Sequence, residues 1–237
     1  MATYNGAKYI RQQIDSILPF MEENDEMIIS DDGSKDDTVE IIKEYTIKDK
    51  RVVFFDGPRQ GVIKNFESAL LKAQKEIVML SDQDDVWFPE KLPRLRQFFE
   101  KNEDVQLVLH DMFFANNGEI DEHTYSKKLF DSYHVKHGFI YNWVYSGYFG
   151  CCMAFTQKLK TFLLPFSKYV NMHDQWIGLI GEYYHKSAFI EEPLIAHRVH
   201  DNNVSQKRPY LVRFKYRVVS LIAFLDKVFC KRKGCSL

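Results

Sequence analysis

Two short apolar runs are each followed directly by a cluster of carboxylates. Residues 27–29 precede Asp31 and Asp32, and residues 77–80 precede an acidic cluster at 82–85. Short runs rich in Ile and Val predict buried strands, and open α/β sheets bind their ligands at the carboxyl ends of such strands. Carboxylates crowded at that edge repel one another and repel a phosphate unless a divalent cation lies between them. The pattern therefore indicates a metal-dependent site for a phosphorylated ligand, such as a nucleotide.

Strands and helices alternate through the first 114 residues. Apolar patterns predict strands at 26–31, 52–56, 76–81 and 105–114, and helices at 6–19, 36–48, 61–73 and 89–101. This alternation predicts an α/β fold with a Rossmann-like, mostly parallel sheet flanked by helices. The chain enters a turn at Thr3 without a preceding strand, so the N-terminal first strand is expected to be largely missing.

The second half of the chain is less regular and ends in a basic tail. A helix is predicted at 172–184, and a strand at 188–195 is interrupted by Pro193. From residue 207 onward there are nine basic residues and one acid, whereas the preceding 206 residues have 23 basic and 32 acidic ones. Apolar residues at helical spacing predict an amphipathic helix at 211–233. The expected division is a body, 1–206, with halves 1–114 and 115–206, and a basic amphipathic C-terminal tail, 207–237.

Four motifs resemble those of family 2 glycosyltransferases. They are TYNG (3–6), DDGSKDDT (31–38), SDQDDVW (81–87) and HDQW (173–176), in the family's order and spacing. Within the family they are most similar to bacterial rhamnosyltransferases of surface-polysaccharide assembly, and the resemblance extends from residue 1 to about 206. It implies a glycosyltransferase-A fold, in which 1–114 is the nucleotide-binding half and 115–206 the acceptor-binding half. It also implies a nucleotide-sugar donor and an inverting mechanism.

The resemblance implies a role for each matching residue. Tyr4 would lie against the nucleobase, and Asp31 would accept a hydrogen bond from its ring N–H. Asp82 would lie near the ribose, and Asp84 would bind Mg²⁺ or Mn²⁺ on the diphosphate. Asp174 would deprotonate the acceptor hydroxyl. Thr3, Asn5 and Asp32 complete the expected nucleotide-binding set.

A late segment, Arg198 to His200, resembles the part of the family that closes on the diphosphate, and His200 is expected to be a further metal ligand. Carboxylate oxygens suit Mg²⁺ or Mn²⁺, and the Cys and His ligands typical of zinc are missing from this cluster. His197 and His200 lie three residues apart, but in a strand that spacing does not favour a metal pair.

Contacts with the donor or acceptor sugar are expected from a further set of residues. They are Asp85, Trp87, Gly147, Gly150, His173, Trp176 and Arg198, with His110 and Asp111 lining the acceptor side. Simpler interpretations remain open for several: the two glycines as a bulge or tight turn, the tryptophans as core, and His173 as a packing residue. Asp174 would, in the simpler view, cap a helix.

The expected reaction moves L-rhamnose from dTDP-L-rhamnose to a lipid-linked oligosaccharide or polysaccharide in surface-polysaccharide synthesis. The four cysteines form no disulfide framework, and neither a signal peptide nor an apolar run of spanning length is present. The expected location is therefore cytoplasmic, peripheral on the inner face of a bacterial cell membrane. The basic tail would bind an anionic membrane surface. No nucleic-acid partner is expected, because the body is acidic.

Three alternatives remain open at this stage. The tail helix would instead dock on the body. A nucleotidyltransferase would want a Gly-rich phosphate loop, and the chain has none. A catalytically impaired, membrane-docked scaffold would explain the short first strand, although it would not require the retained Asp84 and Asp174.

Overall fold

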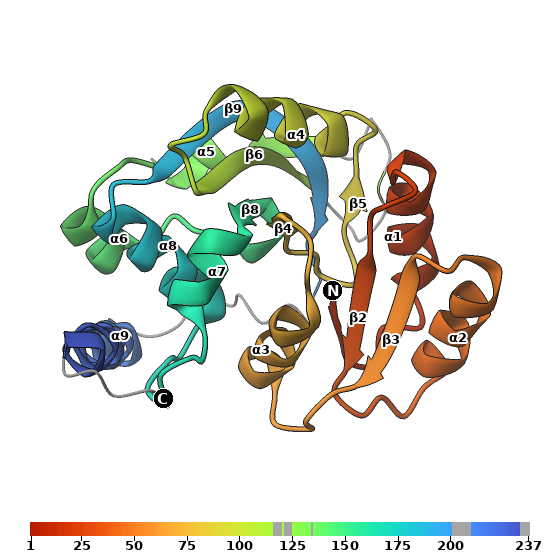
Figure 1. Ribbon diagram of the computed structural model, residues 1–237, viewed down its shortest axis with the longest axis horizontal. Coiled ribbons are helices and arrows are strands. Elements are labelled where there is room, and N and C mark those ends of the chain that lie inside the picture. Colours follow the sequence, from red (N-terminus) through yellow and green to blue (C-terminus); the bar gives the residue numbers. More distant parts are fainter. Residues whose placement is uncertain (116–119, 121–124, 134, 201–209, 233–237) are drawn as a thin grey trace.

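The computed structural model describes residues 1–115, 120, 125–133, 135–200 and 210–232. The predicted α/β architecture is confirmed (Figure 1). In chain order the helices and strands are β1 (Ala2–Thr3), α1 (Ile10–Ile17), β2 (Met27–Asp31), α2 (Thr38–Lys48), β3 (Val52–Asp56), α3 (Val62–Lys72), β4 (Ile77–Met79), β5 (Val86–Trp87), α4 (Lys91–Lys101), β6 (Leu107–Ala115), β7 (Tyr125–Lys128), α5 (Leu129–Tyr133), α6 (Phe139–Tyr145), β8 (Met153–Thr156), α7 (Gln157–Leu163), α8 (His173–Tyr183), β9 (Ser187–Arg198) and α9 (Tyr210–Arg232).

The first sheet is parallel, with strand order β1-β2-β3. All five residues of β2 are buried, as expected for a parallel strand that is covered on both faces. Helix α3 packs on β1 and β2, and α2 packs on β3. This arrangement places the carboxyl end of β2, with Asp31, at the edge where β1 delivers Thr3.

The expectation of a short first strand is also confirmed. β1 pairs with only Ser30 and Asp31 of β2, whereas β3 pairs with all five residues of that strand. Next to β1, a cavity of about 810 Å³ is lined by Met1 and by apolar side chains of β2, α3 and β4. The N-terminal ammonium of Met1 is buried and donates to the carbonyl of Ile28 at 2.7 Å, and burial lowers its pKa to about 5.

The second sheet is mixed, with the path β4-β8-β6-β9-β5 and β7 beside β6. Only β6 and β9 are parallel in it, and the remaining pairs are antiparallel. The predicted interruption at Pro193 is instead a bulge inside one long strand: His110 pairs with Ile190, and the next residue, Asp111, pairs with Pro193. A bulge accommodates proline because the proline has no N–H to donate to the ladder.

The acidic cluster lies in the short connection between β4 and β5. β5 was not predicted, because a two-residue strand carries too little pattern to be recognised. It pairs antiparallel with the end of β9, with Val86 opposite Ala196. The pairing brings the last residues of β9 next to the acidic cluster, about 110 residues away in the chain.

The predicted tail helix is α9, which packs against α6 and α8. The rest of the predicted tail, at 207–209 and 233–237, lies outside the described residues. No helix in the described ranges combines the length and apolar character needed to cross a bilayer.

Candidate active site

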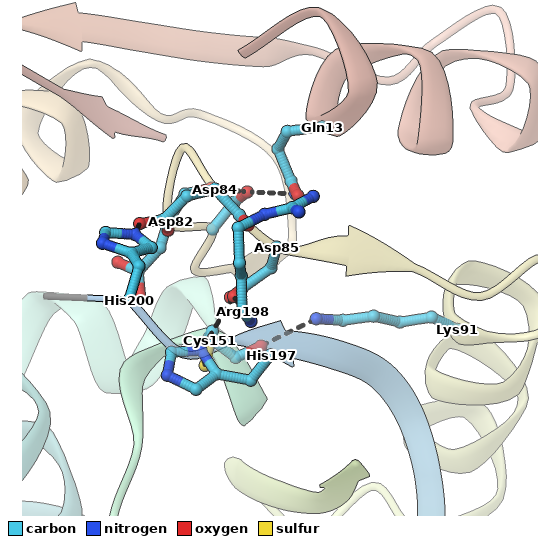
Figure 2. Close-up of polar contacts among 10 residues, drawn as sticks. Gln13, Asp82, Asp84, Asp85, Lys91, Cys151, His197, Arg198 and His200 are labelled. Carbon is cyan, nitrogen blue, oxygen red and sulfur yellow. Dashed lines mark hydrogen bonds and ion pairs between the residues drawn. The ribbon is translucent and has the colours of Figure 1, made fainter. Parts of the chain in front are cut away.

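Three carboxylates of the β4–β5 connection gather at one edge of the fold (Figure 2). The connection is held at its start by Leu80, whose N–H donates to the carbonyl of Met153 at 3.1 Å. The next residue, Ser81, accepts a hydrogen bond from the Gln13 side-chain amide of α1 at 3.0 Å. The backbone is therefore fixed just before Asp82, and the site is positioned by secondary structure on both sides.

Burial and crowding raise the pKa values of two of these carboxylates, Asp82 and Asp84. Burial, followed by the charges of Asp85 and Asp84, raises the pKa of Asp82 to about 8. Burial and the charge of Asp85 also raise the pKa of Asp84. Asp174 contributes to the shift at Asp82, so its charge acts on the same site. Like charges that raise each other's pKa values provide a site where a cation is favourable.

Arg198, at the end of β9, and His200, just after it, contact this cluster, and their expected roles at the diphosphate and the metal remain predictions. His200 Nε2 donates to Asp84 Oδ2 at 2.7 Å (Figure 2). Arg198 Nε donates to the backbone carbonyl of Asp84 at 2.8 Å, and its guanidinium also reaches the Gln12 side chain at 2.6 Å. The guanidinium carbon lies 4.6 Å from the centre of the Tyr9 ring. Arg198 thus joins the acidic cluster to α1.

The donor atoms fit a hard divalent cation. Asp84 Oδ2 and His200 Nε2 lie within hydrogen-bond distance of each other, and both side chains are largely but not fully buried. A cation between them would replace the proton now shared, and it would relieve the repulsion that raises the pKa of Asp82. Oxygen donors with one imidazole suit Mn²⁺ or Mg²⁺.

A second cluster, behind the first, was not predicted. His197 Nδ1 donates to Asp85 Oδ1 at 2.8 Å and lies 4.0 Å from Cys151 Sγ. Burial alone would lower the pKa of His197, but the charge and hydrogen bond of Asp85 outweigh burial and raise it well above its usual value. The three ligand atoms lie within 4.8 Å of one another, as in a metal site. All three residues are buried, however, and a hydrogen bond of the Cys151 thiol with Cys152, together with burial, raises the pKa of that thiol. A buried ion pair therefore describes this cluster better than a diphosphate-bound cation.

The carboxylates after β2 have different surroundings. Asp31 accepts hydrogen bonds from the Thr3 hydroxyl at 2.8 Å, from the Ser34 hydroxyl at 2.5 Å, and from the N–H groups of Gly33 and Ser34. Asp32 accepts from the backbone of residues 60 and 61, at the start of α3. Both carboxylates hold the turns around them, and their expected contacts with a nucleotide remain predictions.

Thr3, Tyr4 and Asn5 lie at the same edge as these turns. The Tyr4 backbone forms two hydrogen bonds with the Gln83 side chain, at 2.8 and 3.1 Å, which join β1 to the acidic cluster. Tyr4 is 52% exposed, so its side chain is available to a planar ligand. Asn5 adopts φ +50° and accepts from the backbone N–H of Lys35. Gln83 was missed, although its place between two predicted aspartates was a signal.

Asp174 lies in the first turn of α8, where its Oδ1 accepts from the N–H of Gln175 at 2.6 Å. The capping position belongs to Met172, so the simpler interpretation of Asp174 as a helix cap is not what the structure shows. The half-buried carboxylate and its effect on the pKa of Asp82 place Asp174 beside the candidate site.

Several expected sugar contacts are corrected by burial. Trp87 is 6% and Trp176 3% exposed, so both rings pack in the core and present no open face to a sugar. His173 stacks on Phe66 with ring centres 4.0 Å apart, and burial lowers its pKa to about 3. Further residues that were expected to contact a sugar are also buried in the interior; they are Asp85, His110, Asp111, Gly147 and Gly150.

The two glycines have packing reasons. A Cβ at Gly150 would lie 2.8 Å from His173 Nε2, and one at Gly147 would lie 3.2 Å from a methyl group of Val135. Close approach to neighbouring side chains, rather than to a ligand, therefore explains both positions.

Comparison with known proteins agrees with the geometry. The sequence profile of glycosyl transferase family 2 matches residues 1–162. An uncharacterized glycosyltransferase of Methanocaldococcus jannaschii is 29% identical over 219 residues, covering 87% of this chain and 72% of that protein. The dTDP-rhamnosyl transferase RfbG of Shigella flexneri is 26% identical, with 86% and 72% covered. The chain spans between 14% and 72% of the length of the first four curated relatives it matches.

Solved structures share the fold. TarS of S. aureus, in complex with UDP, superposes with a TM-score of 0.67 at 18% identity, covering 95% of this chain and 64% of that one. Glucosyl-3-phosphoglycerate synthase from Mycobacterium tuberculosis, in complex with Mn²⁺, UDP-glucose and phosphoglyceric acid, gives 0.56 at 21% identity, covering 95% and 77%. The expected glycosyltransferase-A-like fold is thereby confirmed. Because the family profile matches more than half of this chain, the chain belongs to glycosyl transferase family 2.

Proposed function

We propose that this chain is a metal-dependent, inverting glycosyltransferase that uses a nucleotide-diphosphate sugar. One observation carries the proposal: Asp82, Asp84 and His200 gather after β4, where the raised pKa values of the two carboxylates favour a cation, with the charge of Asp174 acting on the same site. In a structural ion pair the partner's charge holds the pKa of a carboxylate low, as His197 does for Asp85. The pKa values of Asp82 and Asp84 are instead raised, first by burial and then by neighbouring carboxylates.

The donor would lie across the edge formed by β1, the turn after β2 and the acidic cluster. The exposed Tyr4 ring offers a face to the base, and Asp82 lies near enough to Asp84 to hold the ribose beside the diphosphate. Asp84 and His200 would hold Mg²⁺ or Mn²⁺, which supplies positive charge to the diphosphate as the glycosidic bond breaks. Arg198, already at the carbonyl of Asp84, would add a second positive charge.

Asp174 would act on the acceptor. Its carboxylate accepts the proton of the acceptor hydroxyl as that oxygen attacks the anomeric carbon from the face opposite the leaving diphosphate. A single displacement of this kind inverts the anomeric centre. Because a sugar hydroxyl is a weak acid, the proton moves to Asp174 mainly as the new bond forms.

The similarity to RfbG supports dTDP-L-rhamnose as donor, and the basic α9 supports work at a membrane. We therefore extend the proposal to a lipid-linked oligosaccharide or polysaccharide acceptor. The enzyme would act on the cytoplasmic side, peripherally on the inner face of the cell membrane. TarS and the mycobacterial synthase bind UDP or UDP-glucose, so UDP is the nucleotide to compare with dTDP.

The direct test is the thermal midpoint of the protein with dTDP, UDP or GDP, each with and without Mn²⁺. A shift for one nucleotide that requires Mn²⁺ is expected, because a bound ligand stabilises the folded state by mass action. No shift with any nucleotide, at concentrations up to the millimolar range, would contradict the donor site and favour a non-catalytic scaffold.

The base is tested separately with Asp174→Asn. Donor binding should stay intact, while transfer of labelled sugar from dTDP-rhamnose to extracted membrane lipids should fall by a factor on the order of 10² to 10⁴. Near-normal transfer by the variant would place the base elsewhere.

A further inference from the structure

Helix α9 has two apolar faces on opposite sides. The inner face packs on the body, where Ser220, Ala223 and Phe224 are between 0 and 6% exposed. Phe224 contacts the Phe139 ring of α6 with centres 4.6 Å apart. Through this face the tail helix docks on the body, as one of the two interpretations of the tail expected.

Hydrogen bonds fix the inner face in one orientation. Trp143 Nε1 donates to the carbonyl of Arg217 at 2.7 Å, and the Asn171 side chain donates to the carbonyl of Tyr216 at 2.9 Å. Lys227 donates to the carbonyl of Leu164 at 2.8 Å. Side chains from α6 and from the segment between α7 and α8 thus hold the helix, so its outer face has a defined direction.

The outer face is an exposed apolar stripe. Phe214 is 61%, Val218 40%, Ile222 42% and Leu225 41% exposed, and their spacing of four, four and three residues places them on one side of the helix. A helix that is apolar on both sides is usually buried on both sides. Contiguous exposed apolar side chains mark a protein or membrane interaction surface.

The charge of α9 indicates which kind of partner binds the exposed stripe. Its sequence contains six basic residues and one acid. That acid, Asp226, accepts a hydrogen bond from Ser167 of the body at 2.6 Å, whereas Lys215 is exposed. A second copy docked symmetrically on the stripe would bring two positive helices together, which is unfavourable. An anionic lipid surface complements both the stripe and the charge.

We propose that the stripe of Phe214, Val218, Ile222 and Leu225 is seated in the surface of an anionic bilayer, while the inner face of the same helix holds the catalytic body at a fixed orientation to that surface. This membrane-contact surface rests on the proposed function only in that the acceptor is lipid-linked.

The test is flotation with vesicles of phosphatidylcholine alone, or mixed equally with phosphatidylglycerol, using the full chain. The wild type should float with the anionic vesicles and not with the neutral ones. Ile222→Glu should lower the bound fraction by at least about tenfold, because it places a negative charge in the apolar contact. The matched control is Ile47→Glu, since Ile47 is 86% exposed on α2, on the opposite side of the molecule (Figure 1); its binding should equal that of the wild type.

Both variants should melt close to the wild type, because the replaced side chains are exposed. Unchanged flotation of Ile222→Glu, equal losses in the two variants, or equal binding to neutral vesicles would overturn the proposal. So would a wild-type dimer in sedimentation that Ile222→Glu converts to a monomer, because the stripe would then be a self-association surface. Stabilisation by nucleotide and Mn²⁺, measured on the same samples, reports the donor site independently of flotation.

Discussion

The carboxylates after β2 and those after β4 come from the same sequence pattern, an apolar strand followed by aspartates, yet their surroundings differ. Asp31 accepts four hydrogen bonds from neighbouring hydroxyl and N–H groups. Asp82 is dominated by burial and by other carboxylates, and its pKa is raised to about 8. A carboxylate that accepts several hydrogen bonds stabilises a turn, whereas a buried carboxylate beside other carboxylates favours the binding of a cation. Identical substitutions at the two sites should therefore have different effects.

The largest effect is expected for Asp84→Asn. It removes one ligand of the proposed cation, so Mn²⁺-dependent nucleotide affinity should fall by at least about 100-fold. The metal-free protein should be no less stable, because a crowded charge is lost. Titration calorimetry with nucleotide and Mn²⁺ measures the affinity, and urea unfolding measures the stability of the metal-free protein. Asp104→Asn is the control, since that side chain is fully exposed. An unchanged affinity would remove Asp84 from the metal site.

The second effect is expected for Asp31→Asn, which should lower the stability of the fold. Four charge-assisted hydrogen bonds become weaker or are lost, so the free energy of unfolding should fall by about 2 kcal/mol. For a chain of this length that corresponds to a melting point lower by roughly 4–8 °C. A variant as stable as the wild type would show that the turn does not depend on this carboxylate.

The smallest effect, for each step of one pH unit, is a pH dependence. The pKa of Asp82 is raised from 3.8 to about 8 in the folded state, so between these pH values the folded chain retains a proton that the unfolded chain releases. Metal-free stability should therefore fall as pH rises through this window, by up to about 1.4 kcal/mol per pH unit. Urea unfolding in a chelator at pH 5, 6, 7 and 8 should show a flatter dependence for Asp82→Asn than for the wild type. Parallel curves for the two proteins would mean that Asp82 ionises normally.

Local pattern accounts for what the sequence predicted well. Ile10, Ile14 and Ile17 are spaced for one helical face, and all three are buried. The acidic cluster was predicted to follow a strand because that relation needs only neighbouring residues. Arg198 and His200 were identified through resemblance to a family, which carries information on distant contacts that spacing lacks.

The remaining features depend on contacts across the chain. Arg198 reaches Gln12 across 186 residues, and His197 reaches Asp85 across 112. An indole side chain suits sugar stacking and core packing equally well, so the sequence did not distinguish these roles for Trp87 and Trp176. The packed structure shows that both are in the core. The mixed second sheet arises because β8 runs antiparallel between β4 and β6, which no local pattern specifies.

The contact of β9 with the acidic cluster also has a consequence for synthesis on the ribosome. The backbone N–H of Arg198 donates to Asp85 across 113 residues, so the acidic cluster leaves the ribosome long before its partners. At about 5–20 residues per second, the delay is roughly 6 to 23 s. During that interval residues 82–85 of the nascent chain have neither Arg198 nor His200 beside them. The nascent chain therefore completes the proposed donor site only after β9, the last strand of the second sheet, has been made.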